Sequence, residues 1–350
     1  MEKGVSEFIT LPHRDPKFIK YLKGQIEGTR AIPLKTFFLD DFQRRCTTFQ
    51  VIPAKEIIRP SWWRVFSHLL RLRLLTLTLA PLLTTLFWLY AQGIPAFEKV
   101  SAFLLGSVFF LHGAIFLFND YLDYVKGYDW LYPALGSGVL QKGWMTGRGV
   151  FRLGVAFTAL AIVLAIPVFQ KSPLWLWSAP ALALLALGVY MFLRQDIRSY
   201  WWGDLLIFCC LGPLISVGVA SLWSVEDLKV PLWLGFFWGF FSLSILHSRR
   251  LRSLFYMRQH FQGKTHFDQL LWRLKVILVG SFFIWSLGFL LFPFLSFVFL
   301  SILFLSGLGG LLKILSKVRS PASSALLIFR KFLLIFHYLL AGMLSGYFLF

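Results

Sequence analysis

Nine separate apolar runs constrain the fold of this chain more than any other feature. A helix rises about 1.5 Å per residue, so about 20 apolar residues cross the hydrocarbon layer of a membrane. The runs cover residues 74–90, 101–118, 153–169, 174–192, 205–222, 230–246, 274–291, 294–312 and 332–350. The sequence therefore predicts an all-α, polytopic integral membrane protein, built as a bundle of nine transmembrane helices.

The first 60 residues differ from the rest of the chain. They are polar and mixed in charge, and X-Pro pairs break them into short pieces that should not become long helices. We expect residues 1–60 to form a cytoplasmic N-terminal arm of unknown role, and residues 61–350 to form the transmembrane domain. Where the two meet, Trp62 and Trp63 beside Arg64 indicate a segment that lies on the membrane surface.

The chain is strongly basic, with a formal net charge of +19. Such a charge is also typical of nucleic-acid binding, but its placement favours a membrane. Only Lys99, Lys171 and Lys229 fall on one side of the predicted bundle, and the rest of the 35 Lys and Arg residues fall on the other. That bias marks the cytoplasmic face and attracts anionic lipid, so we expect a lipid bilayer and no nucleic acid as partner. In an inner (cytoplasmic) membrane the N-terminus would be cytoplasmic, and nine spans would put the C-terminus on the opposite side.

Two long internal loops follow the second and sixth runs, at residues 121–152 and 247–273. The loops predicted on the other face are short. We therefore expect the polar chemistry, and the active loops, on the cytoplasmic side. The histidines in the second loop show no metal-ligand spacing, and we expect them to be solvated or interfacial. They are His247, His260 and His266.

The second run ends in a cluster of acidic residues. If its helix continues past Phe118, then Asn119, Asp120 and Asp123 share one face, because they are three or four residues apart. Such oxygens suit Mg²⁺, which takes one or two protein carboxylates and fills its other positions with water and substrate phosphates. The alternative is an ordinary solvated helix end. Ionisable groups at membrane depth are nevertheless rare enough to count as functional candidates.

A glycine-rich stretch follows this cluster. Gly136, Gly138 and Gly143 would let the backbone approach a ligand closely, and Lys142 would offer a phosphate a point charge. The alternative is a flexible connector.

Three short motifs resemble the UbiA superfamily of intramembrane prenyltransferases, and most of all its menaquinone branch, the 1,4-dihydroxy-2-naphthoate polyprenyltransferases. These motifs are Asn119-Asp120-x-x-Asp123, Gly127-x-Asp129 and Gly136-Ser-Gly-Val-Leu-Gln-Lys-Gly143. Weaker matches are Arg73-x-x-Thr76 and Gly203-Asp204 followed by Gly212-Pro213. The similarity covers roughly residues 60 to 350 in layout, and only the first acidic motif is specific.

The resemblance implies a reaction and a set of site residues. Mg²⁺ would draw charge from a polyprenyl diphosphate, an allylic cation would form, and an aromatic acceptor, 1,4-dihydroxy-2-naphthoate, would attack it. Asp120 and Asp123 would be the catalytic magnesium ligands, supported by Asn119 and Asp129. Basic residues would bind the substrate, namely Arg73, Lys126, Lys142, Arg249, Arg250, Arg258 and Lys264.

The sequence departs from the family after the sixth run. The two acids of a second aspartate motif fall on Phe255 and Gln259, which cannot bind magnesium as carboxylates do. In one hypothesis, basic residues of this loop bind the diphosphate directly by charge-assisted hydrogen bonds. In another, the protein is a catalytically silent relative that binds isoprenoid or quinone lipid, or acts as an assembly partner. The positive charge also orients the loop in the membrane without any ligand. A transporter is a weaker option, because no repeated pair of broken helices is visible.

Overall fold

A computed structural model of the 350-residue chain describes residues 7–23, 26, 28–39, 44–125, 136–171, 201–257 and 264–349. It divides into two compact units. The first comprises Met1–Leu72 and Phe110–Leu160, and the second comprises Arg73–Phe109 and Ala161–Phe350.

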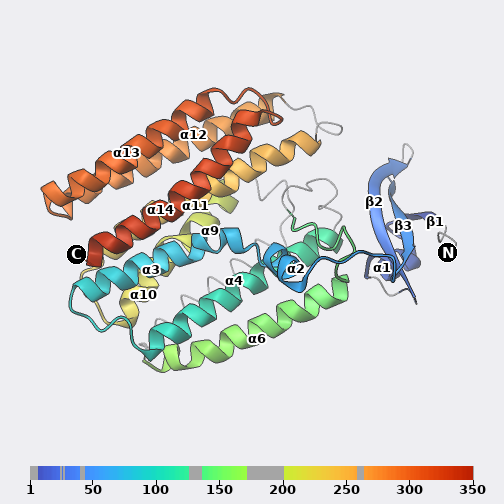
Figure 1. Ribbon diagram of the computed structural model, residues 1–350, viewed down its shortest axis with the longest axis horizontal. Helices are drawn as coiled ribbons and strands as arrows, with labels where there is room; N and C mark the ends of the chain where they lie inside the picture. The colour runs from blue at the N-terminus through green and yellow to red at the C-terminus, as the bar shows by residue number, and fades with distance from the viewer. Residues whose placement is uncertain are drawn as a thin grey trace. The chain divides into compact units, whose positions relative to one another are not determined.

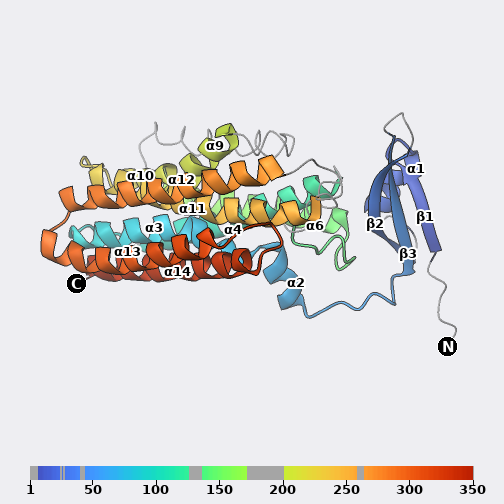
Figure 2. The same ribbon diagram turned by 90° about the horizontal axis from the view of Figure 1, so that it is seen from above.

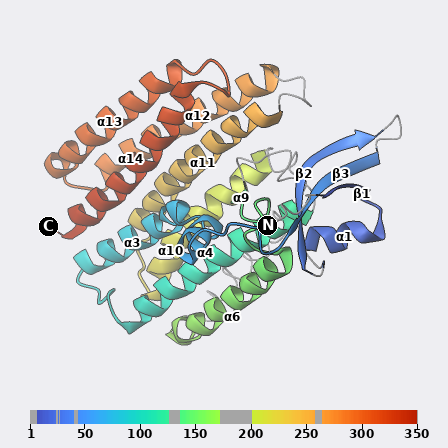
Figure 3. The same ribbon diagram turned by 45° about the vertical axis from the view of Figure 1, so that its right-hand side comes forward.

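The first unit begins with a small antiparallel sheet. Strands β1 (Glu7–Pro12), β2 (Thr29–Leu39) and β3 (Arg44–Pro53) are ordered β1-β3-β2, and helix α1 (Pro16–Lys23) packs against them (Figure 3). Ile9 of β1 is opposite Phe49 of β3, and the ring of Phe18 from α1 meets Phe49 edge-on at 5.6 Å. Phe18 and Phe49 are buried and form the core of this sheet.

This sheet corrects the all-α prediction. Along β1, Ile9 and Leu11 are more buried than Phe8 and Thr10, which is the alternation of a strand with one buried face. The strands mix apolar with polar residues, so their signal in the sequence is weak beside that of a membrane helix. Among the described residues of the arm the helix is the eight-residue α1, which agrees with the prediction of no long helix there.

The rest of the first unit is helical. It contains α2 (Trp62–Leu69), the later part of α4 (Lys99–Val125) and the earlier part of α6 (Gly147–Lys171). Helix α2 is amphipathic: Val65 and Leu69 are buried, whereas Trp62 and Trp63 are 72% and 70% exposed. This is the pattern predicted for a segment on the membrane surface.

Helix α11 lies at the centre of the second unit. This unit contains α3 (Thr76–Ala91), α9 (Trp201–Leu211), α10 (Pro213–Leu222), α11 (Lys229–Met257), α12 (Lys264–Leu287), η3 (Gly288–Leu290), α13 (Phe294–Ser316) and α14 (Ser324–Leu349) (Figure 1). Helix α11 contacts α3, α9, α10, α12 and α14. Figure 2 shows α12 and α14 on either side of it.

Aromatic side chains fill the core around α11. Phe237 lies 5.0 Å from Trp285 of α12 and 5.7 Å from Phe304 of α13, measured between ring centroids, and all three are buried. Glycines allow closer contact where α9 ends and α10 begins. A Cβ on Gly212 would lie 2.2 Å from the carbonyl oxygen of Gly235, so only glycine fits there.

Eight helices in the described part of the chain are long and apolar enough to cross a membrane. They match eight of the nine predicted spans and run Leu72–Ala91, Lys99–Val125, Gly147–Gln170, Trp202–Leu222, Lys229–Arg252, Phe267–Leu290, Phe294–Ser316 and Ser324–Leu349. The remaining span, 174–192, lies outside the described residues and stays a prediction. The prediction of a mostly helical chain with many helices of membrane-spanning length and composition is therefore confirmed.

The two functional loops are shorter than predicted because the helices extend into them. Helix α4 ends at Val125, α11 continues to Met257, and α12 begins at Lys264. Residues 247–257 contain neither Gly nor Pro, so nothing in the sequence stops α11 at the end of its apolar run. Much of the basic "loop" is thus the end of a helix.

Candidate functional site

The acidic cluster lies on the last two turns of α4. The helix continues past Phe118 to Val125, as the predicted shared face requires. The Asn119 Nδ2 donates a hydrogen bond to Asp123 Oδ2 at 2.8 Å, across one turn. Asp120 and Asp123 are buried, with 1% and 3% of their surfaces exposed. These carboxylates are therefore not the solvated helix end of the alternative interpretation.

Arg71 faces this cluster. Its guanidinium donates to Asp120 Oδ1 and forms an ion pair with it. Its Cζ also lies 4.8 Å from the ring centroid of Phe116, one turn before Asp120 on α4. Arg71 is mostly buried between these two residues, so its charge is directed at the carboxylate and shielded from water.

Arg71 holds its position at a cost in backbone strain. It lies between α2 and the 3-10 turn η1 (Leu72–Leu74) with φ at +48°, in the left-handed region that non-glycine residues rarely adopt. Such a conformation costs about 1–3 kcal/mol and persists only where the surroundings hold it, often at functional sites. The ion pair with Asp120 is the contact that would hold Arg71 in this conformation.

Sequence reasoning missed Arg71 and nominated Arg73 instead. The Arg73 side chain is exposed, and its carbonyl oxygen accepts a hydrogen bond from the Tyr338 hydroxyl at 3.1 Å. The signal that could have led to Arg71 is an arginine just before the first span. Arg71 and Arg73 share that signal. The backbone turn at Arg71 directs the side chain of Arg71 to Asp120.

The donor set suits a hard divalent cation. Asp120 Oδ2 is buried and has no hydrogen-bond partner among the described residues. Leaving a buried carboxylate oxygen unpaired is unfavourable, and a bound cation would remove that penalty. In the described part of the chain, no group of three or more His, Cys, Asp or Glu side chains could hold a metal. A cation here would therefore depend on water and ligand oxygens besides Asp120 and Asp123, which is the usual coordination of Mg²⁺.

The glycine-rich stretch contacts the N-terminal sheet. Gly143 has φ at +65°, and a Cβ there would lie 3.2 Å from Ile32 and 3.3 Å from Ile57. The close approach predicted for this glycine is thus made by the protein's own arm. Lys142 is exposed, and its Nζ lies 4.6 Å from the ring centroid of Trp144.

A second charged network lies in the second unit. Asp204, in the first turn of α9, accepts from Arg250 at 2.5 Å on Oδ1, and its Oδ2 lies 3.2 Å from His247 Nε2. The Nδ1 of His247 lies 3.3 Å from Arg250 Nη1. His247 is completely buried, so the prediction that it is solvated or interfacial is wrong. The extension of α11 carries it into the helix packing against α9.

The remaining predicted residues are spread over the chain. Arg249 is half-buried on α11, and Lys264 is the first residue of α12. Lys126, Asp129 and Arg258 lie outside the described residues, so their roles stay predictions.

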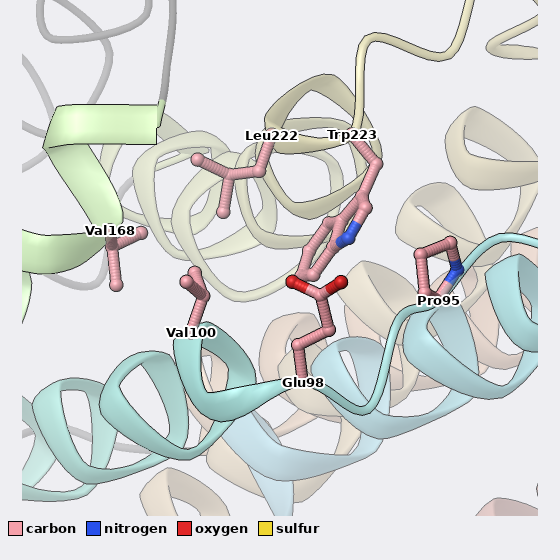
Figure 4. Close-up of a pocket in the computed structure, with 6 residues that line it drawn as sticks. All are labelled: Pro95, Glu98, Val100, Val168, Leu222 and Trp223. Atoms are coloured by element: carbon pink, nitrogen blue, oxygen red, sulfur yellow. The ribbon is translucent and has the colours of Figure 1, made fainter.

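A pocket of about 220 Å³ also lies in the second unit (Figure 4). It contains none of the predicted site residues. Its walls are mostly apolar with one carboxylate, and they are formed by Pro95, Glu98, Val100, Val168, Leu222 and Trp223. A single exposed carboxylate does not form a metal site.

Three solved structures of one archaeal protein have a similar fold. A UbiA homolog from Archaeoglobus fulgidus bound to GPP and Mg²⁺ aligns with a TM-score of 0.59 at 16% identity, covering 81% of this chain and 98% of that chain. The same homolog bound to DMAPP and Mg²⁺ gives a TM-score of 0.58 at 15% identity, covering 81% and 97%. Its structure bound to Cd²⁺ gives 0.53 at 16% identity, covering 81% and 98%.

This likeness establishes the fold. At 15–16% identity it shows the fold alone, and the superfamily named from the sequence motifs stays a resemblance. No protein-family model matches the sequence, and a search of curated proteins found no match either.

Proposed function

We propose that this protein is a membrane prenyltransferase that moves a polyprenyl group from an allylic diphosphate to an aromatic acceptor in a Mg²⁺-dependent reaction. The observation that carries the proposal is the acidic end of α4. There Asp120 and Asp123 are buried on one helix face, and Oδ2 of Asp120 has no hydrogen-bond partner among the described residues. The fold supports it, because the archaeal homolog with this fold was solved with DMAPP or GPP and Mg²⁺.

Residues of the first unit would have separate roles in this reaction. Asp120 and Asp123 would hold the cation, and Asn119 would fix the orientation of Asp123 through its hydrogen bond. Bound there, Mg²⁺ would offset the charge of the departing diphosphate. Arg71 already points its guanidinium at this place, where it would hydrogen-bond the diphosphate oxygens as well as Asp120. Apolar surfaces of the helices would keep water from the prenyl chain.

The acceptor we propose is 1,4-dihydroxy-2-naphthoate, which would place the reaction in menaquinone biosynthesis. This finer assignment rests on the menaquinone-type motifs, including Gly203-Asp204 and Gly212-Pro213 in α9 and α10. We also propose that the acidic end of α4 faces the cytoplasm in the inner membrane, because the basic residues of the chain gather on that side.

A transfer assay tests the proposal. Membranes containing the protein are supplied with a polyprenyl diphosphate and an aromatic acceptor, with Mg²⁺ or with excess chelator. We expect a prenylated naphthoate product with Mg²⁺ only. A panel in which 4-hydroxybenzoate replaces the naphthoate checks the acceptor. If no acceptor is prenylated under any condition, the enzymatic assignment is wrong.

One observation favours a second candidate, a catalytically silent protein that binds isoprenoid or quinone lipid. Arg71 already pairs with Asp120 Oδ1, and Arg250 pairs with Asp204, so two of the charges proposed to bind the diphosphate are paired within the protein. Binding of a prenyl diphosphate without turnover in the assay above would support this candidate.

A further inference from the structure

Arg30 of the N-terminal sheet contacts the glycine-rich loop. Arg30 is the second residue of β2, where the backbone pairs it with Ile52 of β3, so it stands on a rigid element. Its guanidinium donates a hydrogen bond to the carbonyl oxygen of Gly143. This carbonyl belongs to the residue that follows Lys142, so the bond fixes the backbone that carries this lysine.

Apolar contacts reinforce the same point of attachment. Gly143 is buried, and the Ile32 and Ile57 side chains lie so close that a Cβ there would have to displace them. On the other side of the loop, the Trp144 ring meets the His68 ring edge-on at 5.9 Å. Residues from β2 and from the segment before and within α2 therefore contact the loop at two consecutive positions.

Arg30 also lies close to the end of the acidic helix. Burial lowers the pKa of the Arg30 guanidinium, the nearby charge of Arg59 lowers it further, and Tyr124 opposes them. Tyr124 follows Asp123 directly on α4 and is itself buried. Arginine stays charged at neutral pH despite such shifts, so a fixed positive charge lies beside both the loop and the last turn of α4.

We propose that the N-terminal sheet is a clamp on the glycine-rich loop, and that Arg30 is a positioning residue that holds the peptide carrying Lys142 beside the acidic end of α4. This gives residues 1–60 a role, and it rests on the proposed function only where it concerns substrate. Lys142 would meet the diphosphate, whereas Arg30 would act through the loop. The sheet would then be needed for tight binding of the diphosphate and less for the chemical step.

Hydrogen exchange tests the clamp without any activity. The full-length protein in detergent is compared with Arg30→Ala and Arg30→Lys, and with Arg14→Ala, which removes an exposed arginine of the same arm. We expect amides of residues 136–146 to exchange about tenfold faster in Arg30→Ala, since a hydrogen bond from a charged donor is lost. Arg30→Lys should recover part of this protection, and Arg14→Ala should match the wild type. Unchanged exchange in Arg30→Ala would overturn the clamp.

A double-mutant cycle tests the link to substrate. Arg30→Ala should raise the KM for the prenyl diphosphate about threefold, no more than the loss of Lys142 itself, and change kcat much less. In a Lys142→Ala background, Arg30→Ala should raise the KM no further, because the lysine it positions is gone. Additive effects in the cycle would contradict a role through Lys142. If no variant or wild type transfers a prenyl group, the proposed function fails, and hydrogen exchange alone still decides the clamp.

Discussion

The two buried charged clusters of this protein differ in how completely their charges are paired. At the end of α4, Oδ1 of Asp120 pairs with Arg71, and Oδ2 of Asp120 has no hydrogen-bond partner among the described residues. Around α11, Arg250 Nη1 lies 2.5 Å from one oxygen of Asp204, and His247 Nε2 lies 3.2 Å from the other. In the described part of the chain, the Asp204 carboxylate thus has a basic group at each oxygen, whereas Asp120 has one at a single oxygen.

This difference is the basis for proposing a cation site at the end of α4 and a structural role for the Asp204 network. A buried ion is tolerated only where pairing and hydrogen bonds offset its desolvation. The Asp204 carboxylate has Arg250 and His247 as partners, and these contacts join α9 to α11. Oδ2 of Asp120 has no hydrogen-bond partner among the described residues, which is the property expected of the proposed site that is completed by its ligand. Arg250 makes a structural contact with Asp204, and its predicted role as a substrate ligand stays a prediction.

The largest effect should follow removal of the acidic pair. The double variant Asp120→Ala, Asp123→Ala should lower prenyl transfer about a thousandfold or more, because the charge of the leaving diphosphate is no longer offset. Initial rates in membranes measure this. Asp268→Ala, which removes an exposed aspartate of α12, is the matched control and should leave the rate unchanged. Activity retained in the double variant would remove the assigned site.

Breaking the Asp204 network should mainly change stability. Asp204→Ala leaves Arg250 buried without its partner and should cost about 3–5 kcal/mol in the free energy of unfolding. Unfolding in detergent micelles measures it. The double variant Asp204→Ala, Arg250→Ala should lose less stability than the two single variants combined, because it removes both charges and leaves neither of them unpaired.

An exposed ion pair provides the control for that experiment. Asp227 and Lys229 lie 3.8 Å apart with most of their side-chain surface in solvent. Asp227→Ala should change stability by less than about 1 kcal/mol. If Asp204→Ala behaves like Asp227→Ala, the closed network contributes little and the contrast between the two clusters is wrong.

Substitution of Arg71 should have an intermediate effect. We expect Arg71→Ala to raise the KM for the prenyl diphosphate about ten- to a hundredfold, because a buried charge-assisted hydrogen bond to the substrate is lost. Arg71→Lys should recover part of it, since the charge remains but the forked geometry does not. The exposed Arg73 gives the comparison, and Arg73→Ala should change the KM little. The reverse order would favour the sequence-based choice of Arg73.

The smallest effect should come from Lys142. Its side chain is exposed and lies over Trp144, so water already screens its charge. Lys142→Ala should raise the KM for the diphosphate only about three- to fivefold, the range of an exposed ion pair. Steady-state kinetics at two salt concentrations should show a smaller KM difference between Lys142→Ala and the wild type at high salt. A salt-independent loss larger than that of Arg71→Ala would mean that the loop, and not α4, forms the centre of the site.

The sequence could predict the elements whose signals are local. Apolar length alone located eight spans, and the spacing of Asn119, Asp120 and Asp123 placed these residues on one helix face. Helix periodicity and bilayer thickness determine both results, so no tertiary contact is needed to obtain them.

The features that could not be predicted depend on partners distant in the chain. Arg71 meets Asp120 across 49 positions, and Arg250 meets Asp204 across 46. The sheet likewise needs strands that pair across the arm, such as Ile9 with Phe49. Tertiary packing determines which of several arginines pairs with a carboxylate, so the local sequence does not indicate the pair.

Binding of a non-reactive prenyl diphosphate analogue to the purified protein tests the central claim most directly. Calorimetric titrations are run on wild type and Asp123→Asn, each with Mg²⁺ and with chelator. The account predicts tight binding by the wild type with Mg²⁺, and weak binding in the other three cases. Equal affinity with and without Mg²⁺, or an Asp123→Asn variant that binds as the wild type does, would contradict a cation site at the end of α4.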